Sequence, residues 1–246
     1  RQDTVPGALQ PRKTFGRPPT IRGRVAAGFL VFFAYSFTWV FIDWVMSLEP
    51  KWYTNMWAVY GFAGLFEASL AFVLLFTVLF RRARMFDGAV KDYHYVDLAR
   101  IVHAFSIFMV YIGFAEYLLI WYANFRDETI YFHQREVFGW GYLFMFLLFA
   151  KWVLPFCILM NQKVRTNETV LIVMSSLILV AEWLDCYWMI MPVIHTHFYI
   201  PNWIELGVFL GFLGIFGLLG TRYLSRHAMV PIGDPKFLNS VAGKYL

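Results

Sequence analysis

The chain has 246 residues, of which 60% are hydrophobic and only 15% charged, and its net charge is +5. Because so few charged residues could not cover the surface of a soluble domain of this length, the composition places the chain in a membrane. It also argues against a nucleic-acid-binding protein, because a polytopic chain offers no solvated surface on which basic residues could gather.

Six apolar runs follow a basic, proline-containing stretch, residues 1–24, which we predict to be a cytoplasmic linker. Each run has about 20 residues or more, the length that a helix needs to cross a hydrocarbon core of about 30 Å. We therefore predict an all-α, polytopic transmembrane bundle over residues 25–225, built as a four-helix bundle with two further helices, and a tail over 226–246. The runs are 24–47, 54–80, 95–122, 137–160, 169–192 and 203–225.

The basic residues outside these runs are unevenly distributed. Most of the 21 Lys and Arg residues lie on the face that carries both termini, whereas Lys51, Arg126 and Arg135 lie on the opposite face. Because cytoplasmic loops are rich in Lys and Arg, both termini are predicted to be cytoplasmic. This asymmetry also accounts for the net positive charge.

Ionisable side chains interrupt the apolar runs. A charge near the bilayer centre is costly and usually faces a bundle interior or a water-filled path, which makes a proton route the first hypothesis. Arg100, spaced i, i+3 from Asp97, is better explained as an anchor at the end of a span. The remaining residues are candidates for a proton path: Asp43, Glu67, His103, Glu116, Lys151, Glu182 and Asp185.

Each candidate also has a structural explanation. At about 1.5 Å per residue, Glu67 and Glu182 lie near the midplane, with Lys151 slightly to the cytoplasmic side. Lys151 could therefore neutralise Glu67 or Glu182 in a static pair that fixes helix packing. Asp43 could cap the outer boundary of its span. The carboxylates outnumber the one nearby lysine, which favours a functional role for some of them.

Ligands for redox groups are missing from the sequence. Cys157 and Cys186 stand alone, with no Cys-x-x-Cys or haem-attachment motif. Only His103 lies well inside a span, so paired haem ligands at matching depth are not available. His195 and His197 could bind a surface metal, but a solvated pair is the simpler interpretation. We predict no catalytic residue, cofactor or metal in this chain.

Two further patterns concern packing. Pro155 is predicted to kink the fourth span and to free a backbone carbonyl there. Glycines at small intervals in the last span predict close contact with another helix. They are Gly207, Gly211, Gly214, Gly217 and Gly220.

Several long motifs together suggest a family. Residues 43–53 spell DWVMSLEPKWY and continue through YGFAG at 60–64, and residues 111–117 spell YIGFAEY, followed by LIWYAN at 119–124. The tail carries VPIGDP at 230–235. These segments resemble the F subunit family of bacterial alternative complex III, within the NrfD-like membrane proteins. Members usually have more spans, so the resemblance is to the C-terminal six-span portion.

The resemblance implies a place in a quinol:cytochrome c oxidoreductase of the respiratory chain, in the bacterial inner (plasma) membrane. It implies three kinds of partner besides membrane lipids: a quinol-binding NrfD-like paralogue, an iron-sulfur subunit and a multihaem cytochrome c subunit. Haem c, iron-sulfur clusters and quinol are expected in those partners, and a proton path in this subunit. The alternatives are a structural scaffold that docks the redox subunits and, less favoured, an independent secondary transporter, for which the six spans show no inverted repeat.

Overall fold

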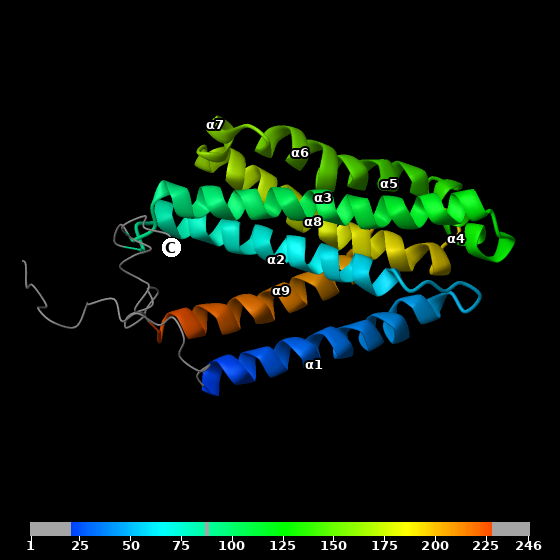
Figure 1. Cartoon of the computed structure of the whole chain (residues 1–246), viewed down its shortest axis with the longest axis horizontal. Coiled ribbons are helices and arrows are strands. Elements are labelled where there is room, and N and C mark those ends of the chain that lie inside the picture. Colours follow the sequence, from blue (N-terminus) through cyan, green and yellow to red (C-terminus); the bar gives the residue numbers. More distant parts are fainter. Residues whose placement is uncertain (1–20, 87–88, 228–246) are drawn as a thin grey trace, which may run out of the picture.

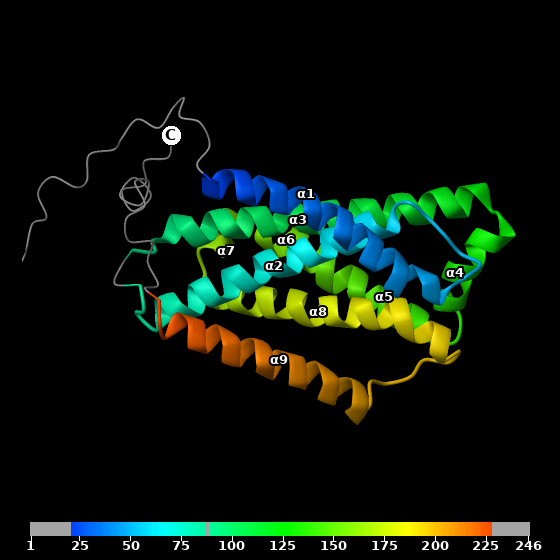
Figure 2. The same cartoon turned by 90° about the horizontal axis from the view of Figure 1, so that it is seen from below.

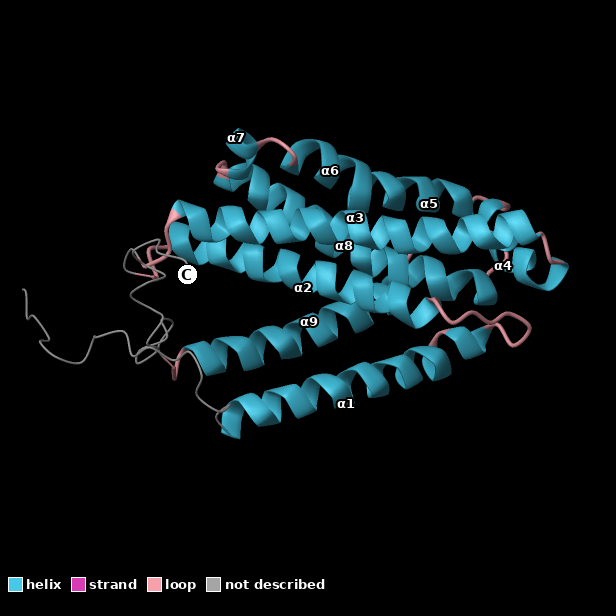
Figure 3. Ribbon diagram, in the orientation of Figure 1, coloured by secondary structure: helices cyan, strands magenta, loops and turns pink. Residues whose placement is uncertain are grey.

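A computed structural model describes residues 21–86 and 89–227 of the chain (Figure 1). Most of the expected linker and tail, with the VPIGDP motif, lies outside the described residues. The described part is entirely helical, and Figure 3 shows helices joined by loops without a strand there. This confirms the predicted all-α class.

Six helices in the described part are long and apolar enough to cross a membrane, which makes the chain a multi-pass membrane protein. The membrane side on which each terminus lies stays a prediction. The elements are α1 (Ile21–Trp44), η1 (Met46–Leu48), α2 (Trp57–Arg82), α3 (Asp92–Ala123), α4 (Arg126–Glu136), α5 (Trp140–Leu148), the π-helical segment η2 (Phe149–Val153), α6 (Leu154–Leu159), α7 (Gln162–Arg165), α8 (Glu168–Ile194) and α9 (Trp203–Leu224).

Four spans form the packed core of the molecule. Helix α2 lies against α3 and α8, and the continuous span α5–η2–α6 covers the side between α3 and α8. Helices α1 and α9 lie at the edge, and neither is buried by the rest of the described chain (Figures 1 and 2). The molecule is therefore a four-helix bundle with two peripheral helices.

The two ends of the bundle differ in composition. The start of α1, the end of α2, the starts of α3 and α8 and the end of α9 lie together (Figure 2). We call this the basic end, since Arg81, Arg82, Arg84 and Lys91 lie there. We call the other the aromatic end, because Trp52, Trp57, Trp140 and Trp188 are buried there in one apolar cluster.

A second apolar cluster fills the bundle toward the basic end. Leu74 and Val78 of α2 pack there with Val102 of α3 and with Leu171 and Ile178 of α8. Small residues let these helices approach closely, as is common where helices pack in lipid. Ala71 and Ala99 have no exposed surface.

The segment η2 and the helix α6 show how Pro155 is accommodated. In a regular helix the proline ring clashes with the carbonyl four residues earlier, which here belongs to Lys151. The chain adopts the wider π-helical turn of η2 just before Pro155, and Lys151 lies in the middle of that turn. Such single π turns are frequent at functional sites. The predicted irregularity is therefore a π turn that carries Lys151.

The glycines of α9 do not make the contact predicted for them. A Cβ atom built at Gly207, Gly211, Gly214, Gly217 or Gly220 meets nothing within 4 Å. The stripe consequently contacts no other helix in the described part of the chain. The prediction of close packing is therefore wrong for the helices that the structure describes, because α9 stands at the edge of the bundle.

Candidate functional site

A buried cluster of charged side chains lies where the two apolar clusters meet. Lys151 Nζ is 2.6 Å from Glu182 Oε2 and 2.6 Å from Asp185 Oδ2. The side chains of Lys151 and Asp185 are only 6% and 2% exposed. One ammonium group therefore faces two carboxylates in an apolar environment, with Glu182 and Asp185 supplied by adjacent turns of α8.

Two residues of α2 shape this cluster. The Tyr60 hydroxyl donates to Asp185, 2.9 Å from Oδ2 and 3.1 Å from Oδ1. A Cβ atom at Gly64 would lie 2.6 Å from Glu182 Oε1, so any larger residue there would require that carboxylate to shift. Tyr60 and Gly64 are one helical turn apart and face α8 together.

A second acid, Glu67, lies further along the same helix. It has no exposed surface, and its Oε1 accepts a hydrogen bond of 2.6 Å from Ser106 of α3. Its Oε2 has no hydrogen-bond partner, and no cation of the described chain forms an ion pair with it. Of the two predicted partners of Lys151, the structure shows Glu182 in an ion pair with it and not Glu67.

A cavity of about 490 Å³ lies beside the cluster. Tyr60, Ser106, Lys151 and Asp185 all line it, and it extends to Tyr117 and Phe132 near the aromatic end. Most of its other walls are apolar. Because a water molecule takes up about 30 Å³ of liquid, the cavity has room for several. It thus places the Lys151 cluster and Ser106, which donates to Glu67, along one space.

Unpartnered polar atoms continue from the cluster toward the basic end. Ser175 Oγ of α8 and His103 Nδ1 of α3 are buried without a hydrogen-bond partner. Ser175 lies two turns before Glu182, and His103 lies one turn before Ser106. Buried polar atoms without protein partners are usual binding sites for ordered water.

Other predicted residues lie apart from this cluster. Asp43 is exposed at the end of α1, on the edge of the bundle. Glu116 is buried on α3 but forms no ion pair among the described residues. Arg100 pairs with Asp97 at 2.5 Å and both side chains are partly exposed, which confirms the predicted pairing.

The burial of a second cation, Arg135 of α4, was not predicted from the sequence, which placed this residue outside the spans. Its guanidinium donates to the carbonyls of Met189, at 2.9 Å, and Tyr131, at 3.1 Å, and lies 3.3 Å from Glu49. It also lies over the Tyr131 ring, 3.5 Å from its centroid. Arg135 thereby joins α4 to the end of α8 and to the loop after α1.

Four residues of these sites escaped the sequence analysis: Tyr60, Gly64, Ser106 and Arg135. The first two fall within the quoted YGFAG segment, so a motif marked them without indicating a role. Ser106 and Arg135 carry no local signal, because their burial depends on which helices pack together.

Neither comparison with known proteins assigns a family to this chain: no family model matches it, and no curated protein matches it. Within the described residues, no three His, Cys, Asp or Glu side chains are grouped so that they could hold a metal ion. The site is therefore defined by its own geometry, as buried acid and base groups in the middle of a membrane bundle.

Proposed function

We propose that this chain conducts protons as a cofactor-free membrane subunit of a respiratory quinol-oxidising complex of the alternative complex III type. The observation that carries the proposal is the cluster of Lys151, Glu182, Asp185 and Tyr60 within the bundle, where Lys151 and Asp185 are buried. A cavity joins this cluster to Ser106, the hydrogen-bond partner of Glu67. Ionisable groups are rarely kept at such depth without a function.

The cluster has the chemistry that proton transfer requires. A proton hop needs a donor and an acceptor within about 2.6–3.2 Å or one water apart. The contacts of Asp185 with Tyr60 and Lys151 and those of Lys151 with Glu182 fall within that range. Lys151 can give up a proton to a carboxylate and regain it, which an arginine does not do.

Cavity water and further buried polar groups extend this path in both directions. Water in the cavity reaches Asp185 and Tyr60 from the aromatic end, and Glu67 with Ser106 takes the proton onward from Glu182. His103 and Ser175 offer water-binding atoms toward the basic end. Asp43 lies outside this route, and Glu116 joins it only through water.

Membership of the complex is supported by the DWVMSLEPKWY and YIGFAEY motifs, and by the structural role of Glu49 within the first motif, which pairs with Arg135. The apolar faces of α1 and α9 suit contact with further membrane subunits. The proposed partners are the quinol-binding NrfD-like paralogue, the iron-sulfur subunit and the multihaem cytochrome c subunit, which would carry quinol, clusters and haem c in the bacterial inner membrane.

A structural scaffold is the second candidate function. The full neutralisation of Lys151 by two acids is what a static packing element would also show. A scaffold loses assembly when its buried acids are neutralised, whereas a proton conductor assembles and loses proton coupling.

The test is proton release and uptake by the complex in liposomes during quinol oxidation, with Glu182→Gln and Glu67→Gln compared with the unmutated protein at equal assembly. Glu136→Gln is the matched control, since Glu136 is exposed on α4. Persisting electron transfer with fewer protons moved in the first two variants supports the proposal. Normal proton movement in both overturns it and favours the scaffold.

A further inference from the structure

A hollow of about 690 Å³ lies at the basic end, between the end of α2 and the start of α3. Three of the side chains that line it are basic, Arg81, Arg84 and Lys91, and Asp92 is acidic. Phe86 and Val90 give it an apolar wall. It lies well away from the Lys151 cluster, and the proposed proton path does not use it.

Arg84 takes an unusual backbone conformation at this place. Its φ angle of 58° is left-handed, and the Met85 N–H donates to the Phe80 carbonyl while the Arg84 N–H donates to the Arg81 carbonyl. This pattern is the Schellman motif that ends many helices, in which glycine is the usual residue at the position of Arg84. The strained residue keeps a long cationic side chain at the rim of the hollow.

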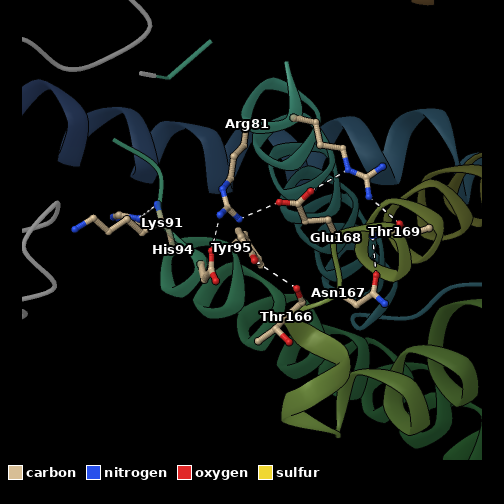
Figure 4. Close-up of polar contacts among 10 residues, drawn as sticks. Arg81, Lys91, His94, Tyr95, Thr166, Asn167, Glu168 and Thr169 are labelled. Carbon is tan, nitrogen blue, oxygen red and sulfur yellow. Dashed lines mark hydrogen bonds and ion pairs between the residues drawn. The ribbon is translucent and has the colours of Figure 1, made fainter. Parts of the chain in front are cut away.

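Two of the described acids at the basic end, Asp92 and Glu168, already form ion pairs with arginine. Arg81 contacts Asp92 at 2.5 Å and Glu168 at 2.9 Å, and Arg82 contacts Glu168 at 2.9 Å. Figure 4 shows Arg81 pointing toward Glu168 and close to Tyr95, with Lys91 to one side. In the described ranges, neither Arg84 nor Lys91 forms an ion pair. With respect to the described residues, these two cations at the hollow are therefore available to an anion.

We propose that this hollow binds the phosphate group of an anionic membrane phospholipid. Arg84 and Lys91 face the phosphate, with Arg81 held behind them by its ion pairs, and the N–H groups at the start of α3 add a favourable dipole. Basic pockets between the ends of transmembrane helices are suited to anionic headgroups. A free phosphate ion shares this chemistry, but the apolar wall of Phe86 and Val90 beside two membrane helices favours a lipid.

The test uses the full chain in neutral detergent, titrated with dihexanoyl phosphatidylglycerol, dihexanoyl phosphatidylcholine or inorganic phosphate, with binding measured as Kd. Arg84→Gly removes the cation and supplies the residue that the backbone conformation prefers, so the variant is expected to fold. Lys91→Gln removes the second cation. Lys163→Gln, an exposed lysine of α7 at the same end, is the matched control.

The proposal predicts that phosphatidylglycerol binds more tightly than the other two ligands. Its Kd should rise about fivefold for each cation removed from the hollow and stay unchanged in Lys163→Gln. An unchanged Kd in Arg84→Gly, or an equal rise in Lys163→Gln, overturns the site. Inorganic phosphate that binds as tightly and depends on Arg84 in the same way overturns the lipid as its ligand.

Discussion

The two buried cations of this bundle, Lys151 and Arg135, are held in opposite ways. Lys151 lies in mid-span and contacts two carboxylates through a single ammonium group. Arg135 lies at the aromatic end and contacts one carboxylate, two backbone carbonyls and an aromatic ring. The first arrangement uses only groups that can exchange a proton, while the second uses mostly groups that cannot.

This difference suits Lys151 to moving protons and Arg135 to holding helices together. Arginine stays charged and fixes several partners with its planar group, whereas lysine changes its charge state more readily when buried. Arg135 connects α4 to the carbonyl of Met189, one turn beyond Asp185, and so holds the part of α8 that carries the acids. We expect variants at the two cations to affect different properties.

The largest effect on stability is expected for Lys151→Met. The substitution leaves the buried Asp185 and the partly buried Glu182 without their cation, which costs about 3–5 kcal/mol of unfolding free energy. Chemical unfolding in mixed micelles measures it. Adding Glu182→Gln and Asp185→Asn should restore most of the loss, because no uncompensated charge remains. A single variant as stable as the original would contradict the buried ion pair.

Arg135→Gln comes next. Loss of two charge-assisted hydrogen bonds to carbonyls and of the contact with the Tyr131 ring should lower the unfolding free energy by about 2–3 kcal/mol. Molecules that still fold should conduct protons normally, as measured by dye fluorescence in liposomes. Reduced conduction at unchanged stability would show that Arg135 belongs to the path.

Gly64→Ala tests the space beside Glu182. The added methyl group displaces that carboxylate from its place near Lys151, so we expect about 1–3 kcal/mol of destabilisation together with slower proton movement. Gly207→Ala on α9 is the control, because a Cβ atom there meets nothing and alanine favours helix. Equal behaviour of the two variants would argue against a role for Gly64.

The smallest effect is expected for Tyr131→Phe, and only in alkali. Burial raises the pKa of the Tyr131 phenol, although the nearby Arg135 opposes this. The raised pKa stabilises the fold fully below about pH 10, the unfolded value, and the contribution is lost as pH rises further, because only the unfolded chain then releases its proton. Thermal unfolding from pH 7 to 11 should therefore show a smaller alkaline loss in the variant.

Tyr60 and Tyr131 provide a matched pair of variants that tests whether the two clusters have separate roles. Tyr60→Phe removes the hydroxyl that donates to Asp185, so it should slow proton conduction at neutral pH. Tyr131→Phe should leave conduction unchanged, because no proton acceptor is paired with that hydroxyl in the described chain. Conduction that falls equally in both variants would mean that the two clusters are not functionally separate.

The spans could be predicted from the sequence, because length and hydropathy determine which segments enter a membrane. The ionisable residues within those spans could be located in the same way. Glu67, Lys151, Glu182 and Asp185 could be named from their depth alone. The pairing of Lys151 with Asp185 depends on the π turn before Pro155, and the burial of Arg135 depends on how α4 folds back against α8. Both are tertiary features that periodicity does not reveal. The glycines of α9 show the converse, because their spacing predicted a helix contact that the described chain does not make.

The central claim is that protons pass through the Lys151 cluster to Glu67. The most direct measurement is proton uptake into liposomes that contain the assembled protein, driven by a potassium diffusion potential, with Glu67→Gln compared with Glu136→Gln. Glu67 forms no ion pair among the described residues, so its amide variant keeps its shape without stranding a charge. We predict that Glu67→Gln abolishes uptake and that Glu136→Gln does not. Equal uptake in both variants would contradict the proton path.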